Sequence, residues 1–268
     1  MKFLAFFISL LLLALNAQAQ TVNPMPTVSD DWRFSGTISG WAPASWTTTS
    51  VGKHTATSDT SINQNLSNTG AAAMFTLEAH KGNWGVMGDL VYWQLSGSGG
   101  ATRYLPGHDG ISLYGGYNGQ LTQTMLTLAG TYTVYDTPTI YLDGLLGARY
   151  ASNTTTVTSN FVLDGLGNRA ATSTNYASHS NQTTDPVIGL KGRARIVDSS
   201  WFVPFYLDAG KGPGSNNGTW QSSIGVGDAF SWGDISLTYR AMGFHMKSSN
   251  SNTNFTNAGP QLSATINF

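Results

Sequence analysis

The sequence predicts an all-β chain that closes into an antiparallel transmembrane β-barrel of about ten strands. Three observations lead to this fold class. Segments of about ten residues alternate between apolar and polar side chains, the connections between them alternate between long and short, and no run of 18 apolar residues follows the N-terminal region. Alternation with a period of two is typical of strands that have one apolar and one polar face.

The N-terminal region is expected to be a secretory signal peptide. Lys2 is followed by an apolar run over 3–15, and the small residues Ala17 and Ala19 suit a cleavage site. The apolar run is shorter than the roughly 20 residues that a transmembrane helix needs. We therefore expect a signal peptide over 1–19, a short periplasmic N-terminal segment over 20–31 and an outer-membrane barrel over 32–268.

The composition disfavours several classes of protein. Charged residues make up 10% of the chain, against about 25% in a typical soluble protein. The net charge is -1 and no basic patch is present, so no nucleic-acid partner is expected. An exported chain without a membrane helix can cross a bilayer as a closed β-barrel. Lipid offers no hydrogen-bond partners, and in a closed barrel every backbone N–H and C=O group is bonded to a neighbouring strand.

The first half of the chain contains five alternating segments. In the segment over 84–93, for example, Trp84, Val86 and Leu90 lie on one face and Met87 and Asp89 on the other. The five segments cover residues 32–41, 73–81, 84–93, 122–134 and 140–150.

The second half repeats the pattern. In the segment over 187–196, Ile188 and Leu190 oppose Lys191 and Arg193. The five segments cover residues 187–196, 201–210, 220–230, 234–244 and 262–268. An eight-stranded barrel is the alternative if the first or the eighth segment of the chain is a loop.

The connections indicate how the strands are oriented. Long connections cover 47–70, 95–119 and 151–184, whereas the turns at 82–83 and 135–138 are short. Outer-membrane barrels combine short periplasmic turns with longer external loops. With an even number of strands, both termini are expected on the periplasmic side and the three long loops outside the cell.

The two faces of the strands predict which residues meet lipid. A charge near the middle of the lipid face costs about 2–4 kcal/mol for Arg or Lys, so the apolar face is expected to point outward. Aromatic residues near the strand ends are expected to form two girdles: Trp32, Trp84, Tyr92, Tyr132, Tyr150, Trp201, Trp220 and Phe230. Charges on the polar face are expected to line the lumen: Glu78, Asp89, Asp143, Arg149, Lys191, Arg193, Arg195, Asp208 and Arg240.

The C-terminus and two turn regions carry a resemblance to a known family. The strand ending on Phe268, the turn "NWG" before "VMGDLVYW" and the stretch "FSWGDISLTYR" resemble the outer-membrane β-barrel (porin-like) proteins of Gram-negative bacteria. The resemblance implies a location in the outer membrane, in contact with its lipid and lipopolysaccharide. It also implies that the barrel-assembly machinery reads Phe268, with Leu262 and Ile266 as outward partners, as an assembly signal.

The inward charges leave two functions open for the lumen. Pairs such as Asp143 with Arg193 or Arg240 would make a salt-bridged plug, whereas unpaired charges would make a narrow, porin-like channel for small solutes. Open aqueous channels come with about 16–18 strands. The small strand number and bulky inward residues favour the plug; those residues are Met87, Tyr141 and Tyr206.

The sequence leaves two further functions to consider, a surface adhesin and an outer-membrane protease. A surface adhesin would use the Ser-, Thr- and Asn-rich loops with Tyr104, Tyr114 and Tyr117, although nothing names a ligand. An outer-membrane protease would need a His–Asp couple at the loop end, and the candidates are His54, His108, Asp109, His179, Asp185 and His245. Because these residues form no recognisable catalytic motif or metal-ligand spacing, we expect no enzyme, no cofactor and no metal.

Overall fold

The computed structural model describes residues 22–104, 112–164, 171–196, 198–212, 217–247 and 251–268. Within these residues the chain forms strands and one short helix with the following bounds: β1 Arg33–Trp41, β2 Ala44–Val51, β3 His54–Thr60, α2 Ile62–Asn68, β4 Thr69–Lys81, β5 Trp84–Tyr104, β6 Ser112–Asp136, β7 Ile140–Asp164, β8 Ala171–Arg195, β9 Trp201–Lys211, β10 Gly218–Phe230, β11 Gly233–Lys247 and β12 Ser251–Asn267.

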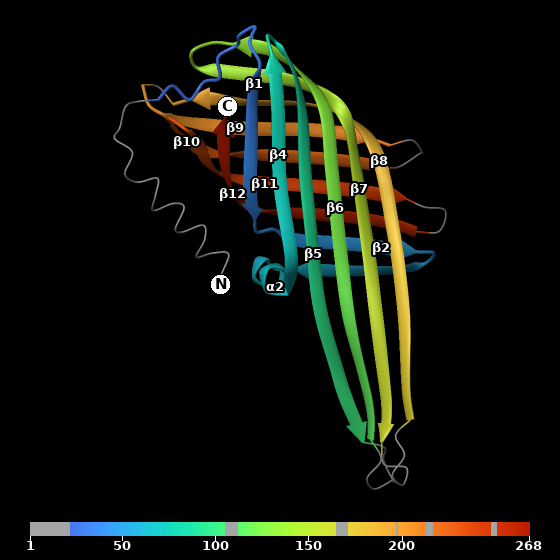
Figure 1. The fold of residues 1–268 in the computed structure, drawn as a ribbon. Helices are drawn as coiled ribbons and strands as arrows, with labels where there is room; N and C mark the ends of the chain where they lie inside the picture. The colour runs from blue at the N-terminus through green and yellow to red at the C-terminus, as the bar shows by residue number, and fades with distance from the viewer. Residues whose placement is uncertain (1–21, 105–111, 165–170, 197, 213–216, 248–250) are drawn as a thin grey trace.

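Ten of these strands close into an antiparallel barrel (Figure 1). The order runs from β1 through β4 and each following strand to β12, and β12 pairs again with β1. This confirms the expected fold class and strand number. The eight-stranded alternative is excluded, because the first and eighth segments are β1 and β10.

The closing seam joins the two ends of the barrel sequence. In β12, residues 261–267 pair with β1, and the backbones of Phe34 and Phe268 exchange two hydrogen bonds of 2.9 and 3.0 Å. The carbonyl oxygen of Ser29, just before β1, accepts from the amide of Gly82 in the β4–β5 turn. Both ends of the described chain therefore lie at the end of the barrel with the short turns, here called the short-turn end.

The first long connection, predicted as a loop over 47–70, has regular structure. β2 pairs with residues 251–258 of β12 and so continues the barrel wall beyond β1, and β3 pairs with β2. Ser61 and Gln64 form a capping box at the start of α2. Asn65 ties the helix to the wall through the carbonyl of Pro43 and the hydroxyl of Ser45.

The predicted loops 95–119 and 151–184 are largely wrong, because strands occupy most of both ranges. β5 pairs with β4 only up to Leu95, and β8 pairs with β9 only from Val187. Beyond these points β5–β8 pair only with one another and extend past the barrel as a four-stranded sheet (Figure 1). We call residues 96–104, 112–120, 156–164 and 171–178 the extended sheet.

The side chains of the extended sheet explain why the alternation of apolar and polar residues does not predict its strands. Both of its faces carry Ser, Thr, Asn and Gly with scattered apolar residues, so no apolar alternation marks the strands. Thr nevertheless has a high strand propensity. Cross-strand contacts between hydroxyl and amide groups add to the backbone ladder, as between Thr174 and Asn160 at 3.0 Å.

An apolar belt surrounds the barrel. Each of the ten barrel strands contributes at least one aliphatic side chain that is more than half exposed; one from each strand is Ile38, Leu77, Val86, Leu128, Leu146, Ile188, Leu207, Ile224, Leu237 and Ile266. Such a belt is too large and continuous for a surface that meets water. Among the described residues, no helix is both long enough and apolar enough to cross a membrane.

Candidate functional site in the barrel lumen

A buried arginine organises the middle of the lumen. Arg149 on β7 reaches past β8 to Asp208 on β9, and both side chains are about 1% exposed. The guanidinium also donates to Thr127, Thr219 and Gln221. With the second contact to Asp208, all five N–H groups of Arg149 have an acceptor. Burial of this charge is therefore compensated in full.

A second ion pair crosses the lumen next to the first. Arg240 on β11 donates to Asp89 on β5 at 2.7 Å, between strands that lie four steps apart in the ten-stranded ring. The side-chain amide oxygen Oε1 of Gln221 accepts from both Arg149 and Arg240 and so links the two pairs. Tyr206 adds a donor to Asp208 at 2.5 Å. We call Arg149, Asp208, Gln221, Arg240, Asp89 and Tyr206 the central network.

Apolar side chains fill the lumen on both sides of the central network. Towards the long-loop end, one cluster joins side chains from six strands: Met74, Val91, Met125, Ala151, Met242, Phe244 and Phe255. Towards the short-turn end, a smaller cluster contains Met87, Ala129 and Leu145, with Tyr206 packed against it. The central network is thus enclosed between apolar layers, which strengthens its electrostatic interactions.

A second group of polar side chains lies nearer the short-turn end than the central network. Glu78 on β4 contacts Lys191 on β8 across the lumen, and Nε2 of His80 lies 3.1 Å from the same carboxylate oxygen. Asp143 is fully buried and accepts from Thr133 at 2.8 Å. The Nζ of Lys191 lies 4.0 Å from the second oxygen of Asp143, so this lysine stands between two carboxylates.

The predicted pairing of Asp143 with Arg193 or Arg240 is wrong. The β7–β8 register places Lys191 directly opposite Asp143, and Arg193 lies two residues further towards the short-turn end. Arg193 pairs with Asp234 at 3.0 Å, and Arg240 pairs with Asp89. Residues at the same number of positions from a short turn lie at different levels along the barrel axis, because closing a sheet requires tilted and staggered strands.

Two inward residues were missed and one predicted charge lies at the rim. Asp234 is 3% exposed, and its position directly after the "SWG" turn hides its inward direction in the sequence pattern. Arg33, which begins β1, donates to the carbonyl of Gly82. Arg195 donates from Nε to the carbonyl of Ser199 at 3.0 Å, in the β8–β9 turn rather than across the lumen.

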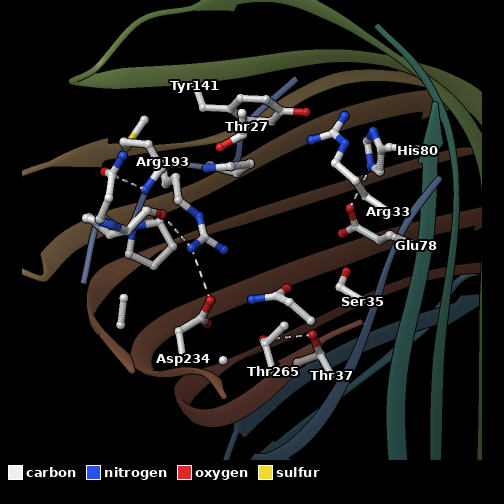
Figure 2. A pocket seen from close by; sticks show the side chains of 18 of the residues that line it. Thr27, Arg33, Ser35, Thr37, Glu78, His80, Tyr141, Arg193, Asp234 and Thr265 are labelled. Carbon is white, nitrogen blue, oxygen red and sulfur yellow. Dashed lines mark hydrogen bonds and ion pairs between the residues drawn. The ribbon is translucent and has the colours of Figure 1, made fainter. Parts of the chain in front are cut away.

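A cavity of about 800 Å³ occupies the short-turn end of the lumen. Its wall includes Glu78, Asp143, Lys191 and Arg193, and it reaches inward as far as Tyr206. Figure 2 shows Glu78 and His80 on one side of this space and Tyr141, Arg193 and Asp234 on the other. The lumen is therefore hollow at one end, below the layer that contains Tyr206.

The aromatic and C-terminal residues singled out in the sequence lie near the ends of the barrel strands. At the short-turn end Trp84 packs edge-on against Tyr132, with ring centroids 4.8 Å apart, and Phe34 stacks on Phe268. The exposed aromatics of the predicted girdles are Trp32, Trp84, Tyr132, Trp201 and Trp220, whereas Tyr92, Tyr150 and Phe230 are half-buried. Ile266 and Phe268 are exposed and Leu262 is half-buried.

The candidate protease residues do not come together in the contacts of the described chain. His245 contacts Asn254, Asp185 is buried and accepts from Thr183 at 2.8 Å, and His179 is exposed on β8. His108 and Asp109 lie outside the described residues, as does the side chain of His54. In the part of the chain that the structure describes, no group of three or more His, Asp or Glu residues could hold a metal ion.

Comparison with known proteins identifies the fold. No family model and no curated protein matches the sequence. The outer membrane protease OmpT from Escherichia coli aligns over 92% of this chain and 100% of its own length, with a TM-score of 0.52 and 10% identity. The translocator domain of autotransporter NalP from Neisseria meningitidis covers 100% of this chain and 95% of its own at a TM-score of 0.33 and 12% identity. Ail from Yersinia pestis aligns over 87% of this chain and 99% of its own length, with a TM-score of 0.31 and 12% identity.

The fold is that of an outer-membrane β-barrel. The similarity to OmpT is a similarity of architecture, since the two sequences share 10% identity. The closed barrel and the continuous apolar belt fit a bilayer and are incompatible with a water-exposed surface. The expected fold class and outer-membrane location are confirmed.

Proposed function

We propose that the chain is an outer-membrane barrel with a sealed lumen, which anchors the extended sheet at the surface of the membrane. The observation that carries this proposal is the central network. Arg149 is buried with every N–H group bonded to protein, which leaves none for water or a passing ion. The apolar clusters on both sides add a barrier to hydrated solutes.

The extended sheet supports a role in contacts with a surface partner. Its tyrosines are exposed, with Tyr104 78%, Tyr117 55% and Tyr176 71% accessible. Aromatic side chains among small polar residues suit binding surfaces, because they combine apolar area with hydrogen-bonding groups. Lipid and lipopolysaccharide are the partners proposed for the belt, and the barrel-assembly machinery is the partner proposed for the C-terminal strand.

A narrow channel is the second candidate, and the cavity at the short-turn end favours it. In that case solutes would have to pass Tyr206 and the central network, which would rearrange during transport. We propose no enzymatic activity, because His245 and Asp185 each contact other residues and not one another.

Conductance in planar bilayers distinguishes the sealed barrel from the channel. The purified mature chain is expected to give no steady current. Arg240→Ala leaves Asp89 without its cation and is expected to allow small currents, whereas Arg103→Ala in the extended sheet is the matched control and leaves the bilayer silent. Reproducible single-channel steps from the unmodified protein would overturn the sealed lumen and establish the channel.

A further inference from the structure

The segment before β1 lies inside the short-turn mouth of the barrel. Pro24 and Met25 are buried, and Met25 is only 7% exposed. Chain ends that nothing holds are usually exposed. Residues 22–27 and Ser29 form part of the cavity wall, opposite the strands that carry its charged groups.

Arg193 connects this segment to the barrel. Its Nη1 donates to the carbonyl of Pro24 at 3.0 Å and to Asp234 at 3.0 Å. The guanidinium also lies 4.3 Å from the centre of the Phe202 ring. Because β11 and β9 fix the guanidinium in this way, it is oriented to hold the backbone of Pro24. Figure 2 shows Arg193 between Asp234 and the N-terminal segment.

Other residues of the segment before β1 also favour its position in the short-turn mouth of the barrel. The side chain of Asn23 accepts from the amide of Met25 at 3.2 Å, which turns the chain at Pro24. Pro24 and Pro26 restrict the free segment, so less conformational entropy is lost when it docks. At its other end, Ser29 accepts from Gly82 at 2.8 Å.

We propose that Val22–Ser29 is a strap that closes the short-turn mouth of the cavity, with Arg193 as its latch. The strap is held by two buried residues, Pro24 and Met25, and by few hydrogen bonds, whereas the barrel wall is held by continuous strand pairing. It therefore opens without unfolding of the barrel. A solute on this side of the membrane reaches Glu78 and Lys191 only when the strap has left the mouth.

Cysteine accessibility tests the strap, because the chain contains no cysteine. Ser35→Cys places a thiol in the cavity wall, and its reaction rate with a charged, membrane-impermeant maleimide is measured on the folded, full mature chain. Met25→Asp, which puts a charge at the buried position, is expected to raise this rate by about tenfold or more. Arg193→Lys keeps a cation beside Asp234 but weakens the hold on Pro24, so it is expected to give an intermediate rate.

Further measurements make the result decisive. Deletion of 22–28 repeats the test if Met25→Asp fails to fold, and heat-modifiable gel mobility reports folding in each case. His179→Cys, at an exposed position of β8 next to the extended sheet, should react at the same rate in all backgrounds. Equal rates for Ser35→Cys with and without the strap would overturn the proposal. Labelling of Ala151→Cys, on the long-loop side of the central network, by maleimide added only at the short-turn side of barrels inserted in vesicles would instead overturn the sealed lumen and leave the strap standing.

Discussion

Strands β5–β8 pass through two environments, and the two halves of each strand differ sharply. In the barrel half of β6, Thr127 and Ala129 are buried while Leu128 between them is 58% exposed. In the extended half of the same strand, Leu113, Tyr114 and Tyr117 are all exposed, although they point to both faces. Backbone pairing continues without a break from one half to the other. The comparison teaches that closure of the sheet, and not strand formation, creates the interior.

Closure of the sheet into a barrel also decides how much free energy it costs to place a charged side chain on a strand. Inside the barrel, Arg149 has lost its water and depends on Asp208 and its neighbours. In the extended sheet, Arg103 is exposed and keeps its hydration. The same residue type in the barrel part of β7 and in the extended part of β5 should therefore respond very differently to substitution.

The largest expected effect is at the buried arginine. Arg149→Met leaves the carboxylate of Asp208 buried without its cation and should lower the free energy of unfolding by about 3–5 kcal/mol. Denaturant titration of the barrel in detergent micelles, followed by tryptophan fluorescence, measures the change. Arg103→Met is the matched control and should stay within about 0.5 kcal/mol of the unmodified chain. Similar losses for both variants would contradict the difference between the two regions.

The outer face gives the second contrast, within one strand. Leu128→Arg places a charge in the apolar belt and should cost about 2–4 kcal/mol if it lies near the bilayer midplane. Asn118→Arg, on the same face of β6 in the extended sheet, should be close to neutral. Unfolding titrations in lipid vesicles compare the two. A neutral Leu128→Arg would place the belt outside the membrane.

The smallest effect concerns the closing seam. Deletion of Phe268 removes two backbone hydrogen bonds to Phe34 and the stacking of the two rings, which together contribute about 1–3 kcal/mol. If Phe268 is also an assembly signal, the fraction of inserted barrel in cells should fall much further than stability in vitro. Membrane fractionation with heat-modifiable gel mobility measures insertion, and refolding in detergent measures stability. Undiminished insertion would contradict the assembly role.

The barrel strands could be predicted because lipid imposes one apolar face on each of them. All ten segments, from 32–41 to 262–268, correspond to strands of the barrel. The extended sheet could not be predicted in the same way, because water on both faces leaves no alternation to read. For the lumen, the inward direction of Asp89 and Arg240 followed from the period of two, but their pairing did not.

By itself, the sequence determined which residues form the barrel wall and which side of each strand is apolar, since both follow from the two-residue period of a strand. Only the tertiary structure decided which charges meet, because the β7–β8 register sets Lys191 opposite Asp143, and closure brings Arg240 across to Asp89. It also decided that Val22–Ser29 lies in the mouth, since this segment has no periodic pattern and its position depends on contacts with Gly82 and Arg193. Distances through the lumen depend on strand tilt and stagger, which no local pattern encodes.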